Sequence, residues 1–190
     1  MKVFYKLKSF LLTIFGDIKV FKWPMFLVYY PYTFRCRANE YRMALHYLQE
    51  GDLIFRKYDD YLDGKFIPGP FSHGAIYIGD RTIIHSTAEG VHEIDLLDYL
   101  RCDKFCILRP NRGQKIAIKR AKNILGKEYD FDFKSTDKRF YCFEVCAYCY
   151  KGAHVKELKS KIFGFIPTFP AFIAESFLTN KNFELIYSSK

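Results

Sequence analysis

Apolar residues recur along the chain in two rhythms, which predict separate strands and helices. Short apolar runs bounded by glycine, proline and polar residues predict strands over residues 53–55, 74–78, 82–86, 90–94, 105–110 and 183–187. Helical spacing predicts helices over residues 39–49, 95–99, 114–125, 140–151 and 171–178. Consecutive strands followed by segregated helices indicate an α+β fold with an antiparallel sheet or small barrel, and exclude a doubly wound parallel sheet.

Two histidines belong to the first predicted hairpin. His73 directly precedes its first strand, and His85 lies on the returning strand. A single strand histidine is usually a surface residue or a core residue with a hydrogen-bond partner. The pair is therefore a stronger indication of a site than either histidine alone.

The connection between the two strands decides whether these imidazoles share a face. A three-residue connection over 79–81 would pair Ile78 with Thr82 and Ala75 with His85. Both imidazoles would then lie on one face, one diagonal step apart, because side chains alternate along a strand. A two-residue turn would place His85 on the opposite face.

Cys142 stands at the start of the apolar helix predicted over 140–151. The partial positive charge of a helix N-terminus favours a thiolate. A thiolate facing an imidazole supplies a nucleophile and a general base. The competing interpretation is that Cys142 is a small buried hydrophobic residue, the usual role of cysteine.

The spacing of Cys142, Cys146 and Cys149 also matches the cluster-binding loop of radical S-adenosylmethionine enzymes. That loop opens a large barrel, and too little of this 190-residue chain follows it. A zinc site would need a fourth ligand from Cys102, Cys106 or a histidine. We therefore expect Cys146 and Cys149 to pack a buried helix face.

The net charge of +9 is concentrated near the N-terminus, where residues 1–42 hold eight Lys or Arg and two acidic residues. Aromatic residues make up 19% of the chain. A basic excess beside Phe and Leu favours an anionic membrane surface as a partner. Nucleic acid is not expected, because the chain has no zinc finger, RNP motif or base-reading basic helix.

The N-terminal segment contains no apolar run of the roughly 18–20 residues that a membrane span needs. Lysines precede the apolar run 10–15, as in a secretory signal, but residues 16–18 form a poor cleavage site. Two interpretations remain: a peripheral anchor in the membrane interface, or a segment that packs on the domain. We divide the chain into this segment, residues 1–38, and a catalytic domain, residues 39–190.

The six cysteines do not indicate a disulfide framework, because the chain is long and rich in core residues. A reducing compartment is the expected location. The chain should therefore be cytoplasmic, with or without membrane association, and secretion is less expected.

The order of the motifs resembles the circularly permuted NlpC-type papain-like superfamily, most closely the YiiX/YaeF-like amidases. The hairpin is also similar to that of lecithin:retinol acyltransferase-like enzymes. In the ordinary papain-like order the Cys helix comes before the His strand, whereas here it comes after. The resemblance rests on residues 51–55 (GDLIF), 72–80 (SHGAIYIGD), 83–85 (IIH), 129–131 (YDF) and 140–145 (FYCFEV).

The resemblance implies a role for each site residue. Cys142 matches the nucleophile, His73 the general base and His85 the third, orienting residue. YiiX-like members often have Glu at the third position, whereas the acyltransferase-like branch has His. Phe143 replaces the Ser that the YiiX-like pattern prefers, and residues 171–172 lack its acidic side chains.

The sequence therefore supports three hypotheses. The first is a cysteine hydrolase, an amidase or peptidase, that acts through Cys142, His73, His85 and an acyl-enzyme. The second is a lipid acyltransferase or thioesterase at a membrane surface. The third is an inactive module of the same fold that binds lipid or protein. The substrate would be a peptide, an amide or a lipid, and the chemistry requires neither a metal nor an organic cofactor.

Overall fold

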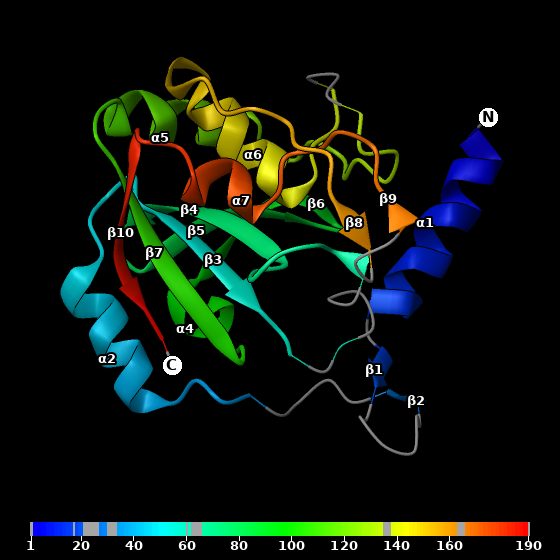
Figure 1. The fold of residues 1–190 in the computed structure, drawn as a ribbon, viewed down its shortest axis with the longest axis horizontal. Coiled ribbons are helices and arrows are strands. Elements are labelled where there is room, and N and C mark those ends of the chain that lie inside the picture. The colour runs from blue at the N-terminus through cyan, green and yellow to red at the C-terminus, as the bar shows by residue number, and fades with distance from the viewer. Residues whose placement is uncertain are drawn as a thin grey trace.

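A six-stranded antiparallel sheet forms the centre of the molecule, with the strand order β10-β7-β3-β4-β5-β6 (Figure 1). The computed structural model describes residues 2–16, 18–20, 27–29, 34–59, 61, 66–134, 138–162 and 166–189. Each predicted strand is present, and the α+β class is confirmed. The strands are β3 (Leu53–Lys57), β4 (His73–Gly79), β5 (Thr82–Thr87), β6 (Gly90–Asp95), β7 (Lys104–Pro110) and β10 (Phe183–Ser188).

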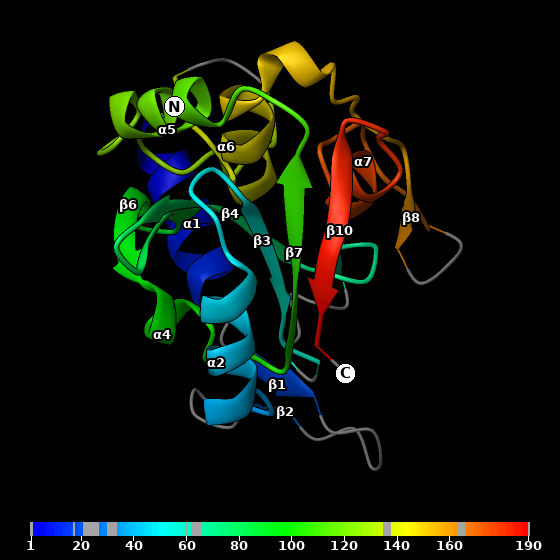
Figure 2. The same cartoon turned by 90° about the vertical axis from the view of Figure 1, so that its left-hand side faces the viewer.

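Helices cover both faces of the sheet (Figure 2). One face packs against α5 (Gln114–Asn123), α6 (Cys142–Cys149) and α7 (Ala174–Leu178). The other packs against α2 (Ala38–Tyr47) and α4 (Leu96–Tyr99). The smaller elements are the 3-10 helix η1 (Lys151–Ala153) and the strand pairs β1 (Ile18–Val20) with β2 (Leu27–Tyr29) and β8 (Lys161–Ile162) with β9 (Ile166–Pro167).

Alternation along the strands divides the core into two clusters. On β3, Leu53 and Phe55 face the α6 side, whereas Ile54 faces the α4 side. On β4, Ile76 belongs to the α6 side and Ala75 to the α4 side. Because both faces of these central strands are buried, residues 53–55 and 74–76 are apolar and show no polar alternation.

Helix α6 approaches β4 closely at Gly74. A Cβ atom at this position would lie 2.8 Å from Phe143 Cδ1 and 3.1 Å from Phe55 Cε1. The glycine therefore lets the first turn of α6 rest directly on the strand that begins with His73. This contact places Cys142 beside the start of β4.

The β4–β5 hairpin pairs Ala75 with His85, as predicted. The predicted pairing of Ile78 with Thr82 is wrong, because Thr82 pairs with Gly79 instead. The register shifts between residues 77 and 79, so Ile78 is the extra residue of a β-bulge.

The turn itself is also shorter than expected. Asp80 and Arg81 form a two-residue connection with φ angles of 46° and 57°, the left-handed conformation that matches the twist of a hairpin. Such a turn alone would have moved His85 to the opposite face. The bulge at Ile78 compensates for the residue missing from the turn, so His85 keeps the expected face.

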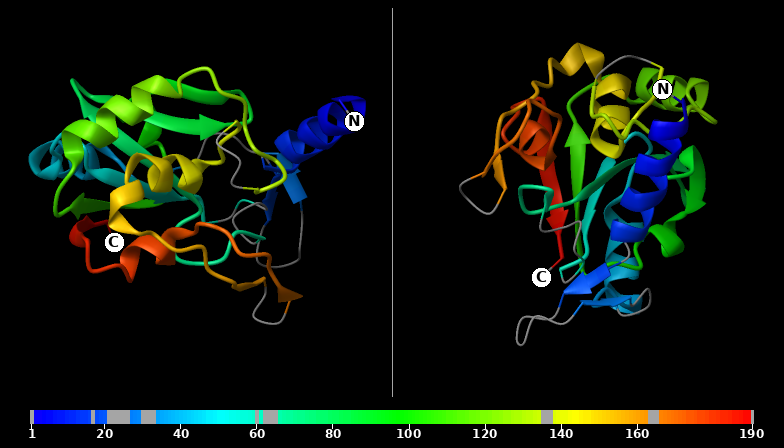
Figure 3. Two further views of the ribbon diagram at one scale, coloured as in Figure 1. Left: turned by 90° about the horizontal axis from the view of Figure 1, so that it is seen from above. Right: turned by 90° about the vertical axis from the view of Figure 1, so that its right-hand side faces the viewer.

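Helix α1 (Lys2–Gly16) lies at one end of the molecule and extends away from the sheet (Figure 3). Tyr5 donates a hydrogen bond to the carbonyl of Tyr129. Lys8 forms an ion pair with Asp132 at 2.6 Å. These contacts connect α1 to the loop before α6. None of the described helices combines the length and apolar character needed to traverse a bilayer.

Candidate active site

His73 and His85 form a directly hydrogen-bonded pair. Nε2 of His73 lies 2.9 Å from Nδ1 of His85, and the two rings are nearly perpendicular at 88°. His85 is buried on the central part of the sheet, whereas His73, at the start of β4, is half-buried. The predicted shared face of the two imidazoles is therefore confirmed.

His92 extends this pair to a row of three imidazoles, which the sequence reasoning missed. His92 pairs with His85 across β5 and β6, and their Nε2 atoms are 3.0 Å apart. Nδ1 of His92 lies 3.0 Å from the carbonyl oxygen of Gly90. Residues 82–86 and 90–94 were both predicted as strands. Pairing these two strands across the short turn between them would have brought His92 opposite His85.

Cys142 is the first residue of α6. The helix begins here because Tyr141 is extended (φ −84°, ψ 169°) and its N–H faces the Glu144 carboxylate at 3.4 Å. The Cys142 sulfur lies 4.0 Å from the carbonyl oxygen of Ser72, and the N–H of Gly74 also faces it. The sulfur therefore lies against the backbone on both sides of His73. Within the described residues it makes no hydrogen bond to the His73 ring.

The thiol of Cys142 is protonated at neutral pH. Burial raises its pKa to about 11, although the N–H groups of Gly74 and Phe143 favour the thiolate. The helix start was expected to favour a thiolate, and this contribution is smaller than the cost of burying the charge. A nucleophile at this position therefore needs a base to remove its proton.

His73 and His85 are neutral at neutral pH. Burial, followed by the nearby positive charge of Arg56, lowers the pKa of His73 well below its usual value. The same two causes, in the same order, lower the pKa of His85 to about 2. The structure thus holds a neutral thiol and two neutral imidazoles, and not a preformed thiolate–imidazolium pair.

Arg56 is a second residue that the sequence reasoning missed. It is 8% exposed and pairs with His73 across β3 and β4. Nη1 donates to the carbonyl of Tyr99 at 2.7 Å, and the guanidinium lies 4.3 Å from the centroid of that ring. Nε is buried without a hydrogen-bond partner among the described residues. Arg56 is followed by Lys57 and Asp59, so the sequence indicated an exposed charged side chain and gave no sign that this cation is buried.

The remaining cysteines of the helix do not join the site. Cys146 and Cys149 are buried and belong to the core on the α6 side, as expected. All six cysteines are free thiols. In the ranges that the structure describes, no group of three or more His, Cys, Asp or Glu side chains is arranged to hold a metal ion.

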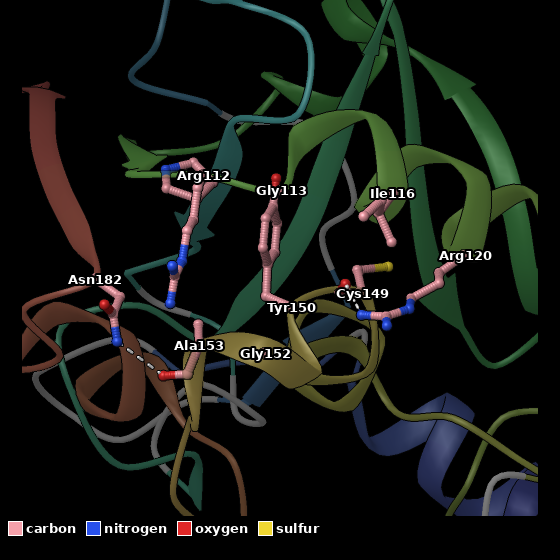
Figure 4. A pocket seen from close by; sticks show the side chains of 10 residues that line it. Arg112, Gly113, Ile116, Arg120, Cys149, Tyr150, Gly152, Ala153 and Asn182 are labelled. Carbon is pink, nitrogen blue, oxygen red and sulfur yellow. Dashed lines mark hydrogen bonds between the residues drawn. The ribbon is translucent and has the colours of Figure 1, made fainter.

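A cavity of about 390 Å³ lies at the opposite end of α6 (Figure 4). Arg112 and Arg120 line it together with Cys149 and Tyr150. Arg120 donates to the carbonyl of Cys149 at 3.0 Å. This cavity is separate from Cys142, which begins the same helix.

Comparisons with known proteins identify a family and two viral relatives of this chain. A family model described as "permuted papain-like amidase enzyme, YaeF/YiiX, C92 family" matches residues 47–187. Protein OPG091 of vaccinia virus strain Copenhagen is 28% identical over 151 residues, which is 75% of this chain and 87% of that protein. The variola virus OPG091 protein is 27% identical over the same shares.

A solved structure has the same fold. The crystal structure of metalloprotein YiiX from Escherichia coli O157:H7 superposes with a TM-score of 0.59 and 20% sequence identity. The match covers 75% of this chain and 98% of the bacterial chain.

Proposed function

This chain belongs to the permuted papain-like amidase family of the YaeF/YiiX type, and we propose that it is a cysteine hydrolase that cleaves an amide through an acyl-enzyme. Cys142 is the nucleophile, His73 the general base and acid, and His85 the residue that orients His73. The observation that carries the proposal is the position of the Cys142 sulfur against the backbone of residues 72–74, on both sides of His73.

The reaction begins with proton transfer from the Cys142 thiol to Nδ1 of His73, since Nε2 of that ring is engaged by His85. The sulfur attacks the substrate carbonyl, and backbone N–H groups at the start of α6 bind the oxyanion. The His73 imidazolium protonates the leaving nitrogen as the C–N bond breaks. His73 then takes a proton from water as the water attacks the thioester, the C–S bond breaks to release the acid, and the imidazolium returns the proton to the Cys142 sulfur.

The raised thiol pKa and lowered imidazole pKa suit this order of events. A neutral thiol and a neutral base avoid two buried charges until substrate binds. Charge separation then coincides with attack on the carbonyl. No step requires a metal or an organic cofactor.

The proposal is tested with p-nitrophenyl acetate as an activated acyl donor. We expect the wild type to release p-nitrophenol and to carry one acetyl group on Cys142, located by peptide mass mapping. Cys142→Ala should lose both while keeping its circular dichroism spectrum. An inert Cys142 in a folded wild type would instead support the binding-module hypothesis and overturn the enzymatic one.

A second candidate, a lipid acyltransferase or thioesterase at a membrane, is favoured by the surface of α1. Five apolar side chains form one stripe along this helix, and all are exposed: Phe4 by 75%, Leu7 by 56%, Phe10 by 61%, Leu11 by 56% and Ile14 by 46%. The opposite side, at Tyr5 and Lys8, contacts the domain. We refer to these five residues as the α1 stripe.

An anionic lipid surface is the occupant we propose for the α1 stripe. Exposed aromatic and aliphatic side chains on one helix face enter the acyl boundary of a bilayer. The helix carries lysines and no acidic residue, and residues 1–42 hold most of the chain's positive charge. Peripheral contact through residues 1–38 would place the catalytic domain against lipid substrates.

Sedimentation with phosphatidylcholine vesicles, with and without phosphatidylglycerol, tests this contact. We expect the full chain to sediment with the anionic vesicles and the variant Phe4→Ser/Leu7→Ser/Leu11→Ser to remain in solution. Leu45→Ser/Leu97→Ser is the matched control, since both leucines are exposed elsewhere on the domain. Equal sedimentation of both variants, or a dimer that only the α1 variant loses, would overturn the membrane assignment.

A further inference from the structure

We infer that His92 is a positioning residue, which fixes the tautomers of all three histidines and leaves Nδ1 of His73 as the unprotonated base. The inference rests on the proposed function, because it assigns the atom of His73 that accepts the thiol proton. It extends the predicted Cys-His-His site by one imidazole. The evidence is the order of donors and acceptors along the row.

The row ends at a group whose role is fixed. The carbonyl oxygen of Gly90 can only accept a hydrogen bond. Nδ1 of His92, 3.0 Å away, must therefore carry the proton. In a neutral ring the other nitrogen then has a lone pair, so Nε2 of His92 is an acceptor.

The same reasoning passes from ring to ring. His85 must donate through Nε2 to Nε2 of His92, which leaves Nδ1 of His85 as an acceptor. His73 must then donate through Nε2 to Nδ1 of His85. Nδ1 of His73 is left with a lone pair, which is the form that a general base requires.

The surroundings keep His73 and His85 in this neutral form. Arg56 from β3 and Tyr99 from α4 face His73 and His85 on the buried side of the row. Burial and the positive charge of Arg56 both disfavour an imidazolium at His73 and His85. Each of these two rings then holds one proton, and with one proton on His92 as well the order of donors along the row has one solution.

The terminal acceptor is held by a loop outside the hairpin. Val91 donates to the carbonyl of Lys127 at 2.8 Å, next to Gly90. A Cβ atom at Gly90 would lie 2.4 Å from that same oxygen, and Gly90 has a φ of +95°. Only glycine fits this position, so the Gly90 carbonyl, at which the row ends, has a fixed direction.

Nitrogen-15 NMR of the imidazoles tests the assignment without any activity measurement. Long-range proton–nitrogen spectra of the wild type at neutral pH should show His92 protonated on Nδ1, and His85 and His73 protonated on Nε2. His92→Leu should return His73 to a mixture of tautomers, whereas His92→Gln, whose amide oxygen can accept from His85, should retain Nε2–H. A wild-type His73 protonated on Nδ1 would overturn the inference.

Hydrolysis of p-nitrophenyl acetate provides the kinetic test. We expect His92→Leu to lower kcat roughly tenfold to a hundredfold and His92→Gln to stay within about threefold, because only the first removes the acceptor. His46→Leu, on the exposed side of α2, is the control. Equal losses in both His92 variants would indicate a merely structural role and overturn the inference.

The two proposals fail in different ways. If acylation at Cys142 is absent but the NMR pattern is as described, the proposed function fails and the tautomer order stands. If acylation occurs and His73 carries its proton on Nδ1 in the wild type, the enzyme assignment stands and the role of His92 fails.

Discussion

The two ends of helix α6 each carry a buried cysteine, and the first of these cysteines lies against the backbone on both sides of His73. Cys142 is 4% exposed and Cys149 is 1% exposed. Burial raises the pKa of Cys142 to about 11 and that of Cys149 to about 12. By exposure and acidity the two thiols are nearly alike.

Their neighbours differ. At the first end, the sulfur lies beside the start of β4, where the row of three imidazoles begins. At the second end, the described residues that line the cavity include two arginines and no histidine or carboxylate (Figure 4). On the proposed function, the comparison teaches that a neighbouring proton acceptor distinguishes a reactive thiol from a packing thiol.

The largest expected difference between the two ends is in turnover. Cys142→Ala should lower hydrolysis of p-nitrophenyl acetate by at least about 10³-fold, since the covalent intermediate cannot form. Cys149→Ala should change it by less than about threefold. Equal losses in the two variants would indicate that the assay reports folding, and circular dichroism of each variant controls for this.

The next difference is in thiol reactivity towards iodoacetamide. Alkylation of Cys142 should rise about tenfold per pH unit between roughly pH 7 and pH 9, because its thiolate fraction grows in that proportion below a pKa of about 11. Mass mapping separates Cys142 from Cys149. A Cys142 rate that is already constant at neutral pH would show a preformed thiolate and contradict the neutral pair.

The imidazole row should also make the protein sensitive to acid. The pKa of His85 is lowered to about 2 in the folded state, from 6.5. Below about pH 6.5 the unfolded chain therefore binds a proton that the native state does not, and stability falls by roughly 1.4 kcal/mol per pH unit.

Urea unfolding of the wild type and His85→Gln between about pH 6 and pH 5 measures this contribution. The wild type should lose roughly 1.4 kcal/mol more per pH unit than the variant. Parallel pH dependence in the two proteins would show that His85 titrates normally in the folded state.

The smallest expected effect is at the cavity end. Arg120→Met removes a hydrogen bond to the carbonyl of Cys149, which should cost about 0.5–1.5 kcal/mol of unfolding free energy. Turnover should be unchanged within about twofold. A larger loss of turnover would place the cavity in the catalytic pathway and remove the contrast between the two ends.

Most of the framework could be predicted from the sequence, because apolar runs and turn residues fix the strands locally. The pairing of Ala75 with His85 was predicted correctly, although the turn between their strands was predicted one residue too long. The bulge at Ile78 compensates for the residue that the turn lacks. Bulges depend on packing across the sheet, and a single strand pattern does not reveal them.

Two site residues could not be found in the same way. His92 becomes visible only when β6 is paired with β5, and Arg56 only when β3 is placed beside β4. The low acidity of Cys142 was also missed, because the cost of burial depends on how closely α6 packs on Gly74. These properties depend on how strands pair and on how closely a helix packs against them, and not on the residues next to each position in the chain.

The most direct test is the rate and site of acylation in single-turnover experiments with p-nitrophenyl acetate. The wild type should acquire one acetyl group on Cys142, and His73→Ala should acquire it at least roughly a hundredfold more slowly. Cys149→Ala should match the wild type. Acylation of Cys142 at the same rate with and without His73 would contradict the pairing of this sulfur with the imidazole row.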